Sequence, residues 1–200
     1  MEKLIQLIHT SGAENWKQRC EEAFDELYSG SNPRYPQKAE KTTSLRAPGS
    51  SFESGVPFAG LIHPSNPDSG AYGGMSFVIF PIENGPCLIS LVIGTQGLSP
   101  DESILGRPGH IRKVRAICAM INSQYGRGEM LAWSKQDPTR TDLDIPLNVK
   151  QIFTYYSSVF ARYGKVLYGI FRPTENREAT VKILKAFLDL MFEEREIKPR

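Results

Sequence analysis

Residues 75–94, MSFVIFPIENGPCLISLVIG, constrain the fold more than any other segment of this 200-residue chain. Two runs rich in β-branched and other apolar residues flank the step Asn84-Gly85, and Asn-Gly between such runs is a strong signal for a β-hairpin. Three more short runs have strand-like composition: VPFAGLI (56–62), EMLAWS (129–134) and KVLYGIF (165–171). The sequence therefore predicts a small, mostly antiparallel sheet.

Helical patterns surround these strands. The apolar spacing predicts helices over 13–28, 108–123, 147–162 and 178–195, the second of them opening at Pro108. Polar loops rich in Pro and Gly or in Asp and Thr fill residues 29–51 and 137–146. The expected fold class is α+β: a single domain with a small, mostly antiparallel β-sheet packed with several helices.

Composition excludes several classes of protein. Three cysteines far apart and three isolated histidines predict neither a disulfide framework nor a metal site, and we expect no cofactor. No signal peptide or membrane-spanning run is present, so we expect a cytoplasmic protein with no membrane partner. With a net charge of +2, nucleic acid could be bound only by local clusters of lysine and arginine.

Enzyme signatures are also missing. The chain has no P-loop, no GxSxG elbow and no HExxH motif, so we expect no enzyme. The glycine-rich segment GTQGLSPDESILGRPG (94–109) lacks the GxGxxG spacing of a dinucleotide site. A phosphate-binding role at the start of the following helix remains open for this segment.

Aromatic residues beside glycines suggest a binding pocket, because flat rings and a few directional polar groups are what a site needs to stack on an extruded base. Phe58 begins a strand, Tyr72 lies in a Gly-rich loop, and Tyr125 lies on a turn with Arg127 at its tip. Trp133 follows on the next short strand. For Phe58 and Trp133, ordinary burial in the core is the competing interpretation.

The densest cationic cluster is Arg107, Arg112, Lys113 and Arg115, within nine residues. Such a run could neutralise phosphates at modest affinity, or simply be the solvated face of a helix. Lys135 and Arg140 could extend the same footprint, and Arg127 lies at the lip of the expected pocket.

The order of these motifs resembles the N-terminal DNA-recognition domain of McrB-type, modification-dependent restriction proteins. The shared features are a Val-Pro-Phe strand start (56–58), a Gly/Ser loop with Tyr72, the apolar hairpin, and a Tyr-Gly turn (125–126) followed by a strand and Ser-Lys-Gln (134–136). The resemblance covers about residues 50 to 140 and lies at the level of motifs. Phe58 stands where the family has a tryptophan, which gives a smaller ring face.

The resemblance implies a domain that flips a modified base, such as methylated cytosine, out of double-stranded DNA into an aromatic pocket. By matching motif, Phe58 would stack on the base, Tyr72 or Met75 would line the side, Ile79 would form the floor and Tyr125 the opposite wall. Phe52 would fall near the loop that wedges into the duplex.

The same resemblance implies partners, and the expected elements divide the chain into three parts. An AAA+ GTPase or ATPase motor and a McrC-type nuclease would act with the domain. Residues 1–50 would be an N-terminal helix with a long polar loop, 51–145 the recognition core, and 146–200 C-terminal helices linking toward a motor that this chain lacks.

Two alternatives remain open. The chain could be a protein-interaction module of an AAA+ motor that docks through its C-terminal amphipathic helix and its Arg-rich helix. It could also be a small-molecule or nucleotide-binding domain built around residues 94–109.

Overall fold

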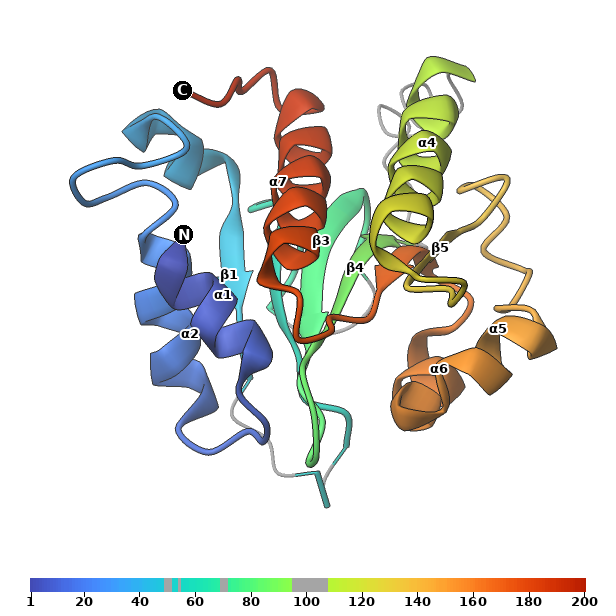
Figure 1. The fold of residues 1–200 in the computed structure, drawn as a ribbon. Coiled ribbons are helices and arrows are strands. Elements are labelled where there is room, and N and C mark those ends of the chain that lie inside the picture. Colours follow the sequence, from blue (N-terminus) through green and yellow to red (C-terminus); the bar gives the residue numbers. More distant parts are fainter. Residues whose placement is uncertain (49–51, 54, 69–71, 95–107) are drawn as a thin grey trace.

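A computed structural model describes residues 1–48, 52–53, 55–68, 72–94 and 108–200 (Figure 1). Its elements, in chain order, are α1 (Glu2–His9), α2 (Trp16–Asp25), η1 (Gln37–Thr42), β1 (Ser44–Arg46), β2 (Ala59–Ile62), β3 (Met75–Phe80), β4 (Leu88–Ile93), α4 (Pro108–Tyr125), β5 (Ala132–Ser134), α5 (Leu147–Ile152), η2 (Thr154–Tyr156), α6 (Ser157–Tyr163), β6 (Leu167–Phe171) and α7 (Arg177–Glu193).

The strands form one antiparallel sheet in the order β1-β2-β3-β4-β6-β5. The predicted hairpin is confirmed: β3 pairs with β4 from Met75↔Ile93 to Phe80↔Leu88. Strand β6, the last of the strands in the described residues, lies between β4 and β5, and among those residues it is the only strand that pairs with β5. Together with the helices, this sheet confirms the α+β class.

Two apolar clusters cover the two faces of the sheet. Helices α1, α2, α4 and α7 pack on one face through a large cluster that includes Phe77 and Phe187, and Figure 1 shows α7 and α4 side by side in front of the strands. On the other face, α5, η2 and α6 pack through a smaller cluster that includes Phe80 and Phe160. Because side chains alternate along a strand, Phe77 and Phe80 of β3 serve opposite faces.

The three expected parts of the chain all contribute to this sheet. Residues 1–50 supply β1, residues 51–145 supply four strands, and residues 146–200 supply β6. The long polar loop predicted over 29–51 contains η1 and β1. The helix predicted over 147–162 is broken at Phe153 into α5, η2 and α6.

Within the described ranges, no helix combines the length and the apolar character needed to cross a bilayer.

Two partly buried histidines predict how stability changes with pH. The Nε2 atom of His9 lies 3.1 Å from Thr180 Oγ1, and His110 stacks on Tyr168 with 5.8 Å between ring centroids. Burial is the main cause that lowers the pKa of each imidazole below the ordinary value of 6.5. Between the lowered folded pKa and 6.5, the unfolded chain therefore binds more protons than the folded one.

We therefore expect the protein to be most stable above pH 6.5 and to lose stability as the pH falls toward 5. The double variant His9→Gln with His110→Gln should give a flatter profile of urea midpoint against pH over this interval. His63→Gln, at an exposed histidine, should keep the wild-type slope. A double variant with the wild-type slope would contradict the assignment.

Candidate ligand-binding site

An open cavity of about 470 Å³ lies on the face of the sheet that α5, η2 and α6 cover only in part. Its lining comes from β2, β3 and β4, from the end of α6, and from the loops before β2 and β3; we call it the aromatic pocket. Its size falls in the usual range for small-molecule sites, roughly 300–1,000 Å³. Four aromatic side chains line it: Phe58, Tyr72, Phe80 and Tyr163.

Three of these rings form one wall. The ring of Tyr163 lies 5.1 Å from that of Phe80 and 6.3 Å from that of Phe58, and Phe58 and Phe80 are 6.4 Å apart (centroid distances). Phe58 and Tyr163 are each partly exposed. Rings held at these distances and tilts stabilise one another while leaving apolar faces toward the cavity.

The sheet register positions this wall. Ala59 pairs with Ile79, so Phe58, one residue earlier, projects from the same face as Phe80. The indole Nε1 of Trp16 donates a 2.9 Å hydrogen bond to the carbonyl oxygen of Phe58, which fixes the chain just before β2. Gly60 has no side chain on this face, where a Cβ would lie 3.0 Å from Val78 Cγ2. The missing side chain helps to keep the cavity open.

Tyr72 forms a separate part of the lining, held by its loop. The side chain of Asn66 accepts a 2.8 Å hydrogen bond from the Gly73 amide and donates one of 3.1 Å to the Gly73 carbonyl oxygen. The amide of Gly94 donates a 2.8 Å bond to Gly74. A Cβ on Gly94 would lie only 2.1 Å from the carbonyl oxygen of Tyr72. Close backbone contact at Gly94 therefore sets the position of Tyr72.

Polar groups stand at the rim and on the floor. Arg162 is exposed at the rim, and its guanidinium carbon lies 5.8 Å from the centroid of the Tyr163 ring. Asp68, also at the rim, pairs with Arg46 at 2.8 Å. Ser76 lies on the floor and has no hydrogen-bond partner for its hydroxyl among the described residues. A planar ligand could thus contact ring faces, a cation, a carboxylate and a hydroxyl.

The pocket differs from the one expected from the sequence. Phe58 and Tyr72 do meet in it, but the placement of Met75 and Ile79 is wrong. Both are fully buried in the larger cluster on the opposite face, beneath α7. Strand parity is the cause, because Met75 and Ile79 share a face with Phe77, whereas Ser76, Val78 and Phe80 face the cavity.

The predicted opposite wall is also wrong. Tyr125, at the end of α4, packs against the larger cluster, and its hydroxyl donates a 2.9 Å hydrogen bond to Glu178 of α7. The sheet therefore separates Tyr125 from Phe58. Trp133 packs on the same face as Phe58, but β5 lies at the far edge, with β3, β4 and β6 between it and β2. Neither ring lines the aromatic pocket.

The cationic cluster on α4 lies away from this pocket. Arg112, Lys113 and Arg115 are exposed on a helix that covers the other face of the sheet, and Lys113 pairs with Glu193 at 2.9 Å. The expected cationic ledge beside the base is therefore wrong for these three residues. Arg107, and most of the glycine-rich segment 94–109, lie outside the described residues.

Lys135 is the clearest correction among the predicted phosphate contacts. Its side chain is buried, and its ammonium donates hydrogen bonds to the carbonyl oxygens of Arg140 (3.2 Å), Leu143 (2.7 Å) and Lys165. Burial lowers the pKa of Lys135, while Asp144 and Asp142 act in the opposite direction. The residue thus ties the 137–146 loop to the chain just after α6 and is not available to a ligand.

The remaining predicted contacts are scattered. Arg140 forms a two-pronged ion pair with Asp142, both bonds 2.7 Å long, and this pairing lowers the pKa of Asp142 to about 2. Arg127 is exposed on a turn with φ of 49°. Phe52 lines a different cavity. In the described part of the chain, no group of His, Cys, Asp and Glu could hold a metal ion.

Sequence reasoning missed Phe80, Tyr163 and Arg162. Phe80 looked like an ordinary strand residue, and its parity with Phe58 depends on a register that only the paired strands reveal. Arg162 ends the segment predicted as a plain helix, and Tyr163 follows it, whereas both residues belong to α6. A weak signal was available, because Arg162-Tyr163-Gly164 places a cation and a ring at a helix end, where backbone direction changes.

The C-terminal amphipathic helix, which one alternative treats as a docking arm, is packed against the sheet. Helix α7 buries its apolar stripe in the larger cluster, including Ile183, Phe187 and Met191.

Comparisons with known proteins find no matching family model, no similar curated protein and no similar solved structure.

Proposed function

We propose that this domain reads a nucleobase extruded from double-stranded DNA and holds it in the aromatic pocket. The observation that carries the proposal is the convergence of Phe58, Tyr72, Phe80 and Tyr163 on one open cavity with Arg162 at its rim. Base–aromatic stacking tolerates any base and contributes roughly 1–3 kcal/mol per base. Arg162 is exposed at the mouth of the pocket, where a duplex backbone would pass.

The resemblance to McrB-type N-terminal domains supplies the target and the setting of this proposal. The base would carry a modification such as a methyl group on cytosine, and the domain would perform no chemistry itself. A motor ATPase or GTPase and a McrC-type nuclease would be its partners in a cytoplasmic defence system.

The test compares duplexes of one sequence carrying cytosine, 5-methylcytosine or N6-methyladenine, in fluorescence polarisation at fixed salt. We expect one modified duplex to bind more tightly than the unmodified one, with affinity falling steeply as salt rises. Phe58→Ala should weaken that binding by about tenfold or more, from the loss of one stacking face. Arg162→Gln should weaken binding of every duplex to a similar extent, because it removes a phosphate contact.

Tyr125→Ala is the matched control, because it removes an aromatic ring of similar exposure from the opposite face. It should leave DNA affinity at the wild-type value. Equal losses in Phe58→Ala and Tyr125→Ala would contradict a base pocket at Phe58. Binding of a free nucleoside, with no binding of any duplex, would favour the small-molecule alternative instead.

A further inference from the structure

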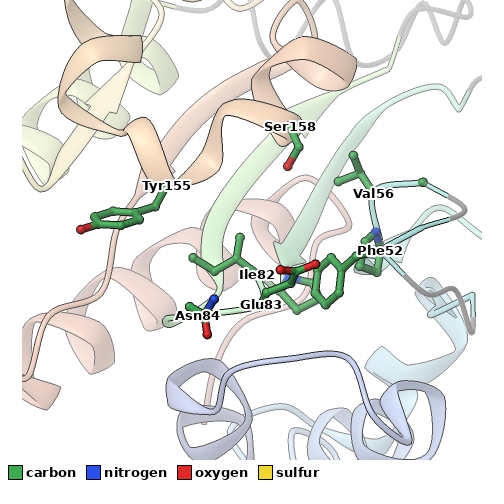
Figure 2. Close-up of a pocket in the computed structure, with 10 residues that line it drawn as sticks. Phe52, Val56, Ile82, Glu83, Asn84, Tyr155 and Ser158 are labelled. Atoms are coloured by element: carbon green, nitrogen blue, oxygen red, sulfur yellow. The ribbon is translucent and has the colours of Figure 1, made fainter.

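A second cavity, of about 340 Å³, opens beside the turn of the β3–β4 hairpin (Figure 2). It is lined by Phe52, Gly55, Val56 and Pro57 before β2, by Pro81, Ile82, Glu83 and Asn84 of the turn, and by Tyr155 and Ser158 near the start of α6. We call it the Glu83 cavity. No residue lines both this cavity and the aromatic pocket, so the two cavities are separate.

The turn that carries Glu83 is firmly held. On one side, the Gly85 amide donates a 3.0 Å hydrogen bond to Ser11 Oγ, and the Ile82 carbonyl oxygen accepts one of 2.8 Å from Gly12. On the other side, the Tyr156 hydroxyl donates a 3.0 Å bond to the carbonyl oxygen of Pro86. The side chain of Glu83 therefore projects from a fixed backbone, so a ligand at this cavity would meet a preformed site.

The polar side chains of the cavity have no partners among the described residues. Glu83, Asn84 and Ser158 make no side-chain hydrogen bond or ion pair within the described ranges, and no lysine or arginine lines the cavity. Together they offer carboxylate, amide and hydroxyl oxygens. In Figure 2, Glu83 and Asn84 lie between Phe52 on one side and Tyr155 on the other, with Ser158 above them.

This arrangement is complementary to a guanidinium group. Arginine presents five N–H donors and no acceptor, bonds a carboxylate with two parallel hydrogen bonds, and stacks its plane on aromatic rings. Acceptor oxygens between two aromatic side chains match each of these properties. A carboxylate ligand or a phosphate would instead be repelled by Glu83.

A segment with several exposed apolar side chains includes Tyr155, which also lines the cavity. In the described part of the chain, the large apolar side chains that stand out into solvent are Leu143 (49% exposed), Leu147 (71%), Ile152 (40%) and Tyr155 (75%). All four fall within thirteen consecutive residues, and we call them the α5 patch. Large apolar side chains exposed along one short segment are typical of a region that contacts another protein.

We propose that the Glu83 cavity and the α5 patch together dock a protein partner through an arginine flanked by apolar side chains. The arginine enters the cavity and bonds Glu83, Phe52 and Tyr155 contact its guanidinium plane, and the flanking side chains cover Leu147 and Ile152. The site is independent of the base pocket, which lies elsewhere on the same face of the fold.

The test uses a short fluorescent peptide in which one arginine is flanked by leucine residues, and a twin with citrulline in place of arginine. Citrulline keeps the shape of the side chain and loses its charge. Fluorescence polarisation should show the arginine peptide binding at least tenfold more tightly than its twin. Glu83→Gln should abolish this difference, and Tyr155→Ala should weaken both peptides.

Glu53→Gln is the matched control, because Glu53 is an exposed acid in the same loop as Phe52 but outside the cavity lining. It should leave the preference for arginine intact. Equal effects of Glu53→Gln and Glu83→Gln, or no binding of the arginine peptide at millimolar concentration, would overturn the proposal. Glu83→Gln should bind modified DNA like the wild type. The peptide assay and the DNA assay therefore test the docking site and the base pocket separately.

Discussion

Replacing Gly94 with alanine is expected to lower the Tm by roughly 10 °C and to abolish binding at the aromatic pocket. The added methyl carbon would lie 2.1 Å from the Tyr72 carbonyl oxygen and 2.4 Å from Gly73 Cα. Both contacts involve backbone, so the two segments must separate. Separation breaks the Gly94–Gly74 hydrogen bond and moves Tyr72 out of the lining of the pocket.

Thermal unfolding and DNA binding of the same preparation check this result together. Gly109→Ala is the control, because a Cβ at Gly109 in α4 meets nothing within 4 Å. Alanine also favours a helix over glycine, so this variant should be as stable as the wild type or slightly more stable. A Gly94→Ala protein with wild-type stability and binding would show that the two segments separate without cost.

Replacing Lys135 with methionine is the second change with a large expected effect, a loss of about 3 kcal/mol in the free energy of unfolding. Methionine fills similar space but donates no hydrogen bond, so three carbonyl oxygens lose a charged donor. The three bonds are partly buried, and partial burial makes the loss of a charged donor more costly than at an exposed site. The loop at 137–146 and the chain after Tyr163 would then no longer be tied together.

Urea unfolding measures this loss, and the matched control is Arg140→Gln. Arg140 pairs with Asp142 at the exposed surface, where an ion pair contributes little, so the urea midpoint should not change measurably. Equal midpoints for Lys135→Met and wild type would mean that the buried ammonium does not hold the loop. We also expect weaker ligand binding in Lys135→Met, because the Lys165 carbonyl that Lys135 holds lies two residues after Tyr163 and one before Val166, which both line the pocket.

The fold was largely predictable because its signals are local. Asn84-Gly85 between two apolar runs predicts a hairpin wherever it occurs, and the stripe along α4 predicts a helix packed on one side. By contrast, nothing local predicts β1, because Ser44, Leu45 and Arg46 are each only partly buried and depend on β2 for their pairing. The break at Phe153 also depends on its burial under the sheet.

Only part of the pocket lining was predictable. The lining depends on how β2 pairs with β3 and on which face of the sheet each helix covers. The strand MSFVIF is apolar at five of its six positions and buried at all six, so the sequence carries no alternation to tell one face from the other. Once β2 and β3 are paired, Phe58 must share a face with Phe80 and not with Ile79. The prediction for Tyr125 was wrong for a related reason. The sequence of a helix does not show which face of a sheet the helix will cover.

The place of β6 in the sheet also has a consequence for biosynthesis. A ribosome delivers β4 and β5 well before β6, which lies between them and pairs with both. Until then, the nascent chain carries an unpaired strand edge at β4 and a β5 segment that lacks its partner strand β6. Such edges are prone to pair with other chains. Completion of this domain is therefore necessarily a late event, and chains arrested before residue 167 should require chaperone protection.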